Sequence, residues 1–530
     1  MHTPSTDTDA PNFLATIVAT IGPASESPEM VRRLISAGVG VFRFNFSHGE
    51  FAMHQKRLDT VRAVAHEMGV EVACLGDLQG PKIRVGKVPA GVGKPSPSGG
   101  GLVEVRAGED VVFKAGISEA MYRSDGAAGG VPQLVLPVTY QALVREVQAG
   151  HKLLVNDGAI RMLAVEQDRE RGELRCRVVV GGVISSNKGI NVPQSELSAS
   201  AITERDWECV AWAVKNDMDY LALSFVRSAD EIIELKERLA QMCPSVKPDR
   251  EAVYGVWIPV VAKIEMPQAV KNLDAIVSAA DAVMVARGDL GVEMDIAKVP
   301  VVQKQIVAAC RVRGKPCIVA TQMLETMIDN STPTRAEASD VANAIFDGAD
   351  AVMLSAETAV GKHPVLVVET MARIVATAED RLRDMGAELS PPLFFEDSHR
   401  TTAALAEAAA TITQELQARA VVCWSERGGT ARYLSQNRFH VPIVAYSSDP
   451  QQTRRMALLR GVLAVCAKPP GRGTLNDWNV AVDEYVRGRH IAKRGDYVVL
   501  VAGRPLAQAK ASNTLAIYKV GEPTGGYLQT

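Results

Sequence analysis

The sequence has little that would tie it to a membrane or to a polyanion. No apolar run approaches the roughly 18–20 residues that a membrane span requires. The chain of 530 residues carries 58 Lys and Arg against 61 Asp and Glu, a formal net charge of −3. This balance gives no reason to expect nucleic acid or an anionic membrane as a partner. Aromatic residues make up only 5%, but 47% of the residues are hydrophobic, which is enough to bury a core and excludes general disorder.

The chain also lacks the cysteine pairs of a zinc site or a disulfide framework. Its eight cysteines are scattered and none forms a CxxC pair. We therefore expect a reduced, cytoplasmic protein without structural zinc. The first residues are polar, without the basic and apolar regions of a signal peptide, and we expect a short tail over 1–12.

What the first two-thirds of the chain does contain is a series of eight short, β-branched apolar runs, most of them separated by helix-like stretches. The runs cover 16–22, 39–46, 71–77, 220–226, 258–265, 281–289, 316–322 and 350–358. Near-continuous apolar strands that alternate with helices are typical of a parallel sheet covered by helices. Eight units predict a (β/α)₈ TIM barrel of the α/β class. An open, doubly wound sheet is the alternative that periodicity alone does not exclude.

Two further units are expected outside the barrel. The segment 86–185 has no long helix but several alternating strand-like runs, which predicts an inserted β-barrel lid domain, all β, over the C-terminal mouth of the barrel. The alternation of strands and helices resumes after a proline-containing linker at 385–399, which predicts a five-stranded C-terminal α/β domain over 385–530. The barrel would then comprise 13–85 and 186–384.

Polar residues gather where the predicted barrel strands end, and in a barrel these ends meet on one face. They are Arg43, Asn45, Ser47, His48, Asp77, Lys263, Glu265, Asp289, Thr321, Gln322, Ser355 and Glu357. Carboxylate oxygens suit Mg²⁺ or Mn²⁺, and the Arg and Lys side chains can hold an anion. A single charged strand end could be a solvated rim, but six together predict a site. Beyond these ends, the spacing of Thr334 and Glu337 predicts a helix-capping box, which is a structural feature.

Seven strings give the chain a specific resemblance to the pyruvate kinase family, in order, from about residue 16 to 520. They are FRFNFSHG (42–49), GDLQGPKIR (76–84), SNKGINVP (186–193), AKIEMPQAV (262–270), VARGDLGVE (285–293), VATQMLETM (319–327) and PTRAEASDVANAIFDGADAVMLSAET (333–358). The resemblance implies a barrel, an inserted lid and a C-terminal regulatory domain. It also implies Mg²⁺-dependent transfer of the phosphoryl group of phosphoenolpyruvate to ADP, giving pyruvate and ATP.

The resemblance assigns roles to individual positions of this sequence. It implies that Glu265 and Asp289 ligate Mg²⁺ or Mn²⁺, and that Lys263 and Arg43 contact the transferring phosphoryl group. Gly288 and Asp289 would receive the substrate carboxylate, and Thr321 would lie on the face where the enolate is protonated. The implied nucleotide positions are Asn45, His48, Arg84, Lys188 and Asp157 of the lid. A homotetramer is a further family expectation.

Two regions depart from the family pattern. Many members hold K⁺ with groups that correspond to Asn45, Ser47, Asp77 and the Leu78 carbonyl, and they carry a Glu where this chain has Lys82. We therefore expect that K⁺ is not required. In the C-terminal domain, the expected effector loop holds Ser425, Arg427, Gly428, Gly429 and Thr430, with glycines added to the usual pattern, and 502–513 lacks a glycine-rich loop. This pattern favours a monophosphate activator, such as ribose 5-phosphate, glucose 6-phosphate or AMP, over fructose 1,6-bisphosphate. A domain that only forms the tetramer is the alternative.

Two other functions compete. One is a Mg²⁺-dependent keto-acid aldolase or lyase on the same barrel, which would need neither the lid nor a lysine beside the metal. The other is an inactive metabolite sensor, which is disfavoured because every catalytic motif position is filled.

Overall fold

The computed structural model describes residues 12–95, 100–123, 132–195, 197–198, 200–242, 258–385, 400–470, 475–503 and 512–522. All but the last residue of the expected tail, nearly all of the linker at 385–399 and most of 502–513 therefore lie outside the described residues.

Eight parallel strands close into a barrel in the order β1-β18-β17-β16-β15-β14-β3-β2. Their bounds are β1 Thr16–Thr20, β2 Val39–Asn45, β3 Ala73–Asp77, β14 Tyr220–Leu223, β15 Val260–Ile264, β16 Ala282–Ala286, β17 Cys317–Ala320 and β18 Ala351–Leu354. The predicted TIM barrel is confirmed, and the open sheet is excluded. The predicted run 281–289 is too long as a strand, because the chain turns into a helix at Arg287.

The barrel strands are buried on both faces, which explains their near-continuous apolar sequence. In β1, Ile17 and Ala19 belong to the core between strands and helices, whereas Val18 belongs to the core inside the barrel. Ala457 and Leu458 of the C-terminal domain complete the inner core, so that domain covers the end of the barrel at which its strands begin.

Helices surround this barrel. Their bounds are α1 Pro28–Ser36, α2 Phe51–Met68, α4 Glu204–Lys215, α5 Ala229–Met242, α6 Pro267–Lys271, α7 Leu273–Ala279, α8 Arg287–Glu293, α9 Val299–Val312, α10 Arg335–Asp347, α11 Ala356–Ala359 and α12 Pro364–Asp384, with 3-10 helices at Ile296–Lys298 and Glu325–Ile328. The predicted capping box at the start of α10 is confirmed: the Thr334 hydroxyl accepts from the Glu337 backbone N–H, and the Glu337 carboxylate accepts from the Thr334 backbone N–H.

The insertion after β3 is almost entirely β structure, with one short helix, α3 Leu143–Glu146. Its strands are β4 Lys94–Pro95, β5 Gly101–Val105, β6 Asp110–Lys114, β7 Met121–Arg123, β8 Gln133–Pro137, β9 Lys152–Val155, β10 Ile160–Asp168, β11 Glu173–Val180, β12 Gly182–Ile184 and β13 Ile190–Asn191. In the described residues they form a seven-stranded sheet, β13-β9-β10-β11-β6-β8-β7, and a three-stranded sheet, β12-β5-β4. The insertion has a separate hydrophobic core.

The C-terminal domain holds the predicted five-stranded sheet, in the order β21-β20-β19-β22-β23. Its elements are α13 Arg400–Glu415, β19 Ala420–Trp424, α14 Gly429–Gln436, β20 Ile443–Ser447, α15 Pro450–Met456, β21 Val462–Cys466, α16 Leu475–Gly488, β22 Tyr497–Ala502 and β23 Thr514–Lys519. Only β23 runs antiparallel to its neighbour. Helix α16 was not predicted from the sequence.

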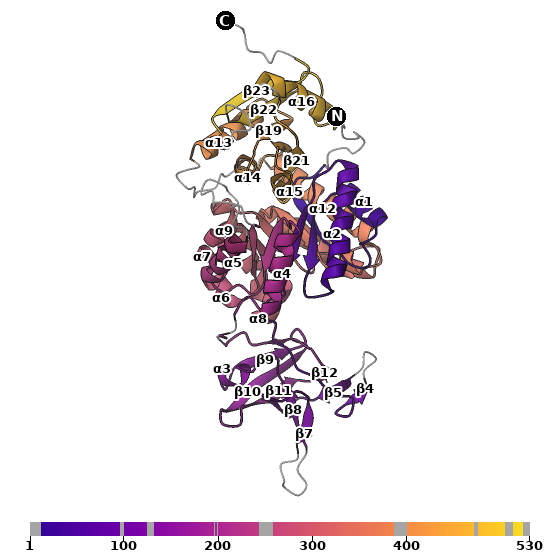
Figure 1. Ribbon diagram of the computed structural model, residues 1–530, viewed down its shortest axis with the longest axis vertical. Helices are drawn as coiled ribbons and strands as arrows, with labels where there is room; N and C mark the ends of the chain where they lie inside the picture. The colour runs from indigo at the N-terminus through magenta and orange to yellow at the C-terminus, as the bar shows by residue number, and fades with distance from the viewer. Residues whose placement is uncertain are drawn as a thin grey trace.

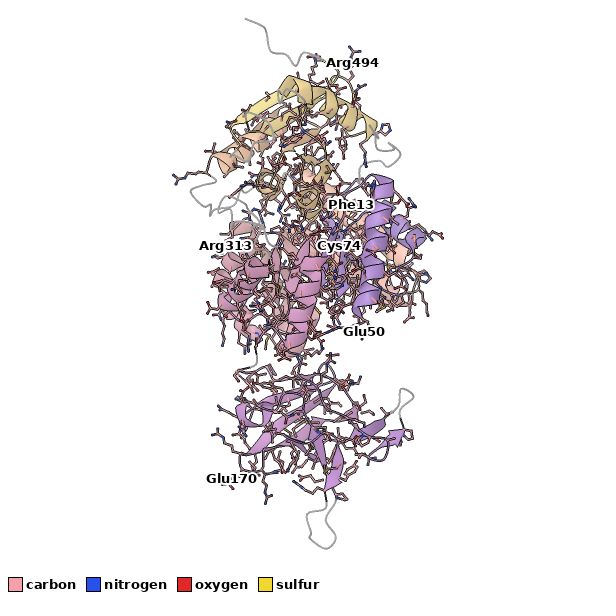
Figure 2. All side chains as sticks on the ribbon, viewed as in Figure 1. Phe13, Glu50, Cys74, Glu170, Arg313 and Arg494 are labelled. Atoms are coloured by element: carbon pink, nitrogen blue, oxygen red, sulfur yellow. The ribbon has the colours of Figure 1, made fainter. Side chains whose placement is uncertain are left out.

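The three parts lie in a row, with the barrel between the lid and the C-terminal domain (Figure 1). Glu50, which follows β2, lies at the lid-facing end of the barrel, and Cys74 of β3 lies toward the C-terminal domain (Figure 2). The strands therefore point their C-terminal ends at the lid, as predicted. Among the residues described, no helix has the length and apolar character needed to cross a membrane.

Candidate active site

Three strand ends bring a charged cluster together at the lid-facing mouth. Arg43, within β2, donates to Asp77, the last residue of β3, with an Nε–Oδ2 distance of 2.7 Å. The ammonium of Lys263, from β15, lies 3.2 Å from Asp77 Oδ1 and 2.9 Å from Glu265 Oε1. Asp77 and Glu265 are each 1% exposed, so both carboxylates face protein rather than water. Of the residues predicted at the strand ends, these four form one contact network.

Ser224 is a member of this network that sequence reasoning missed. Its hydroxyl accepts from Lys263 Nζ at 2.7 Å and donates to the Leu78 carbonyl at 2.7 Å. The lysine is therefore oriented by two carboxylates and one hydroxyl. The serine directly follows β14, and its position between β3 and β15 comes from the strand order of the barrel.

The buried charges shift one another's pKa values. Burial alone would raise the pKa of Asp77, but the charges of Lys263 and Arg43 outweigh it and hold that pKa below its usual value. Burial works against the Lys263 ammonium, yet Asp77 and Glu265 keep the pKa of this lysine well above its ordinary range. Lys263 is therefore a fixed cation at neutral pH.

Glu265 and Asp289 form the candidate metal pair. Burial raises the pKa of Glu265 to about 7; Lys263 opposes this shift, and the negative charge of Asp289 adds to it. Glu265 Oε2 accepts from the backbone N–H of Phe225 at 2.6 Å. Two carboxylates that repel each other beside a single lysine fit a divalent cation with oxygen ligands. No cluster of three or more His, Cys, Asp or Glu residues that could hold a metal occurs in the described part of the chain, so other ligands would have to come from substrate or water.

Thr321 lies next to the start of α8. Its hydroxyl accepts from the backbone N–H of Gly288 at 2.7 Å, and its φ is +69°, an unusual conformation for a β-branched residue. Such strain persists only where surrounding contacts maintain it. Arg287, which sequence reasoning also missed, provides such contacts: its guanidinium donates to the Thr321 carbonyl at 2.7 Å and pairs with Asp340 of α10 at 2.6 Å.

The remaining mouth residues are placed as follows. The side chain of Asn45 accepts from the Ser47 backbone N–H, and Asn45 pairs with Asp77 in the barrel register. Leu78 is buried, and His48 is exposed on the loop before α2. Asn45, Ser47, Asp77 and Leu78 thus come from two neighbouring strand ends.

The predicted positions on the lid side lie around its two connections to the barrel. Lys82 Nζ is 3.5 Å from Asp157 Oδ1, on the loop between β9 and β10. Arg84 donates to the Asn187 carbonyl at 3.0 Å, and the Lys188 carbonyl accepts from the Val85 backbone N–H at 2.8 Å. Arg84, Lys188 and Asp157 are not brought into contact with the Lys263 network by any hydrogen bond or ion pair among the described residues.

The last strand contributes a structural carboxylate. Glu357, 2% exposed, accepts from the backbone N–H groups of Ser355 and Leu324. Burial raises its pKa, and these backbone donors oppose that shift. Gln322 continues the strained turn after Thr321, with a φ of +55°.

In the C-terminal domain, the predicted effector loop leads into α14. The Ser425 hydroxyl accepts from the Ala431 backbone N–H at 3.1 Å, and the Thr430 hydroxyl lies 2.7 Å from that of Ser512. Gly428 has a φ of +77°, which permits the tight entry into the helix, and Gly429 is the first residue of the helix. Arg427 lies within the same loop.

Comparisons with known proteins agree with this architecture. The family description "Pyruvate kinase, barrel domain" matches residues 14–368, and "Pyruvate kinase, alpha/beta domain" matches residues 403–518. A pyruvate kinase of Mycobacterium tuberculosis is 38% identical over 508 residues, covering 96% of this chain and 98% of the relative. One from Thermococcus litoralis is 37% identical over 514 residues, covering 97% and 100%. The crystal structure of a pyruvate kinase from Cryptosporidium parvum superposes with a TM-score of 0.81 at 29% identity, covering 96% of each chain.

Proposed function

The chain belongs to the pyruvate kinase family, and from that premise we propose that it transfers the phosphoryl group of phosphoenolpyruvate to ADP, giving pyruvate and ATP. The observation that carries the proposal is the buried Lys263 ammonium, held between Asp77 and Glu265 at the mouth of the barrel. Phosphoryl transfer depends on positioning and on neutralising negative charge, and a fixed cation at a strand end supplies both.

Each mouth residue then has a defined task. Lys263 stabilises the charge on the transferring phosphoryl group, and Arg43, held by Asp77, binds the same group. Glu265 and Asp289 hold Mg²⁺, which supplies Lewis-acid polarisation of the substrate oxygens when bound. Gly288 and Asp289, at the start of α8, receive the substrate carboxylate. Thr321, fixed by Arg287, positions the proton that converts the enolate to pyruvate.

For the nucleotide, we propose that Asn45, His48, Arg84 and Lys188 bind ADP, with Asp157 approaching when the lid closes. Arg84 and Lys188 support this assignment because they lie on the two chain segments that connect lid and barrel, so a movement of the lid moves both.

The test is pyruvate formation by the purified full-length chain with phosphoenolpyruvate, ADP and Mg²⁺. We expect turnover that requires all three. Release of pyruvate from a keto acid in the absence of ADP would instead support the lyase alternative. Absence of any turnover would support the inactive sensor.

We further propose that this chain needs no K⁺. Lys82 replaces the family's Glu at the mouth, and its ammonium lies 3.5 Å from Asp157 of the lid. Two unit charges about 4 Å apart interact by roughly 4 kcal/mol at an effective dielectric of about 20, so replacing a carboxylate with an ammonium changes the local electrostatic energy strongly. We expect near-full activity in tetramethylammonium buffer and K⁺ dependence in Lys82→Glu. A many-fold rise of wild-type kcat on adding K⁺ at constant ionic strength would contradict this.

Regulation by a phosphorylated effector is proposed at residues 425–430. The hydroxyls of Ser425 and Thr430 at the start of α14 support a phosphate-binding role, because backbone N–H groups at a helix start also favour anions. An effector screen at sub-saturating phosphoenolpyruvate should show ribose 5-phosphate, glucose 6-phosphate or AMP as the best activator. A best response to fructose 1,6-bisphosphate, or no response to any phosphate, would overturn this proposal. A homotetramer and a cytoplasmic location remain family expectations.

A further inference from the structure

A cavity of about 330 Å³ lies beside the two connections between lid and barrel; we call it the hinge cavity. Its walls come from 81–83 on the outgoing connection, 190–192, 195 and 197 on the returning one, residues within 225–231 after β14 and within 266–272 around α6, and Glu293 at the end of α8. Its volume falls at the lower end of the roughly 300–1,000 Å³ range typical of small-molecule pockets. The predicted substrate, metal and effector residues do not line it. Lys82 does, and so does Phe225, whose backbone N–H donates to Glu265.

Three side-chain oxygens on these walls are buried and have no hydrogen-bond partner. They are Asn191 Oδ1, Gln268 Oε1 and Glu293 Oε2. Asn191 is 8% exposed and Glu293 5% exposed. The Asn191 amide N–H₂ donates to Glu293 Oε1 at 2.7 Å, which fixes the amide orientation and leaves its oxygen as the unpaired atom. Buried polar groups are normally paired, so three unpaired acceptors on residues that line one cavity call for a donor.

Among the residues that the structure describes, no cation forms an ion pair with the carboxylate of Glu293. Burial raises the pKa of Glu293 to about 7, the Asn191 amide opposes this shift, and the charge of Asp289 adds to it. Two other charged groups of the lining are bound to each other: the Arg227 guanidinium contacts Glu231 at 2.7 Å, and it also donates to the Leu197 carbonyl at 2.6 Å. Lys82 is directed to Asp157.

Much of the rest of the lining is apolar. Ile83 and Val192 come from the lid connections, and Phe225 and Met266 come from the barrel. A molecule that fits must therefore carry hydrogen-bond donors at one end and an apolar body at the other.

We propose that the hinge cavity is a binding site for a small organic cation, a primary ammonium group on an apolar body. An ammonium group carries three donors and no acceptor, which matches the three unpaired oxygens, and its charge pairs with the buried carboxylate. An alcohol offers one donor, and a primary amide adds an acceptor that would face the same oxygens. Because the walls belong to both lid connections and to the barrel, a bound molecule contacts parts that move relative to one another when the lid moves.

Benzylamine is a suitable probe, with benzyl alcohol as its neutral match, titrated into the full-length protein by calorimetry and ligand-observed NMR. We expect saturable binding of benzylamine, at least about tenfold tighter than that of benzyl alcohol, because a hydrogen bond to a charged group contributes more than a neutral one. Glu293→Gln removes the charge at constant shape and should weaken the binding of benzylamine about tenfold or more. Gln268→Met, at a partly exposed position, should weaken it about threefold without threatening the fold.

Matched controls locate the site. Glu208→Gln on α4 makes the first chemical change at an exposed position, and Gln55→Met on α2 makes the second at a partly exposed one. Both should bind benzylamine like the wild type. The proposal is overturned by absence of saturable binding, by equal affinity for the alcohol, by unchanged binding in both hinge variants, or by a crystal structure with benzylamine in which the cavity holds water only. None of these results depends on whether the protein is a kinase.

Discussion

The two ends of the barrel each bury an aspartate among cations, but the two clusters behave differently. At the mouth, Asp77 contacts Arg43 at 2.7 Å and Lys263 at 3.2 Å. At the opposite end, which we call the base, Asp219 contacts Arg454 at 2.9 Å and Arg62 at 3.1 Å. The pKa of Asp77 lies below its ordinary value, whereas burial raises the pKa of Asp219 to about 6 despite the nearby arginines.

The difference lies in what surrounds each pair. The base is closed by the C-terminal domain: the Tyr220 hydroxyl donates to the Arg455 carbonyl at 2.6 Å, and Arg454 belongs to the same helix, α15. Its charges join two domains. The mouth carries one carboxylate more than cations among Arg43, Lys263, Asp77, Glu265 and Asp289, and it faces the lid. Similar ion pairs thus join two domains at one end and, on the proposed function, bind substrate at the other. Substitutions that break the ion pairs at one end at a time should therefore separate effects on stability from effects on turnover.

Glu265→Gln should have the largest effect. Removing one of the two carboxylates proposed to hold Mg²⁺ should lower kcat/KM by about 10³-fold or more, because a bound metal supplies several kcal/mol of charge stabilisation. Steady-state kinetics over a Mg²⁺ series measures this. Glu379→Gln is the control near the base, where Glu379 accepts from the Leu14 backbone and pairs with Arg460. It should lose stability but keep kcat within about twofold. Equal losses of kcat in both variants would contradict the division between the two ends.

The pH dependence of stability should have opposite signs at the two ends. The folded pKa of Asp219 is raised to about 6 from an unfolded value of about 4, so its contribution is fully present below pH 4 and is lost as pH rises through 6. The free energy of unfolding of wild type minus that of Asp219→Asn should fall by about 2–3 kcal/mol from pH 4 to 7. The folded pKa of Asp77 lies below its unfolded value of about 4, so its contribution to stability is present above pH 4 and is lost as pH falls below that value. Urea unfolding across this pH range checks both signs. If the free energy of unfolding of wild type minus that of Asp219→Asn rose with pH, the raised pKa of Asp219 would be refuted.

Arg454→Met should have a smaller effect on stability. It removes one of the two arginines on Asp219, and because Arg62 remains, the cost should be about 1–2 kcal/mol, below the 3–5 kcal/mol of a buried pair broken outright. Chemical denaturation measures the change, and kcat should stay within about twofold. Arg32→Met, which breaks the exposed pair with Glu67, should cost less than about 0.5 kcal/mol. A loss in Arg454→Met no larger than in Arg32→Met would show that the base pair does not hold the domains.

The barrel could be predicted because its strands are buried on both faces and so read as apolar, β-branched runs. The carboxylates and cations at the strand ends followed from the same pattern. Asp289 was placed at the end of a strand, but it lies three residues beyond β16, within α8, because the backbone enters the helix at Arg287. Helix α16 was missed altogether.

Ser224 and Arg287 could not be predicted as site residues because their partners are distant in the sequence. Ser224 depends on the contact of β14 with β3 and β15, and Arg287 on Asp340, 53 residues away. Nothing in a lone serine after an apolar run, or in an arginine before a glycine, signals such contacts. The positive φ of Thr321 and Phe225 is likewise imposed by tertiary contacts, since neither residue type favours it.

The central claim is that the mouth cluster, rather than buried lysine–aspartate pairs in general, carries the chemistry. The chain offers a matched pair of lysines: Lys263 contacts Asp77 at 3.2 Å at the mouth, and Lys236 contacts Asp281 at 2.9 Å at the end where the strands begin. Pyruvate formation from phosphoenolpyruvate and ADP by Lys263→Met and Lys236→Met, both shown to be folded by circular dichroism, is the direct measurement. We predict a loss of kcat of about 10³-fold or more for Lys263→Met, and activity within about twofold of wild type for Lys236→Met. Near-normal turnover in Lys263→Met, or equal loss in both variants, would contradict the account.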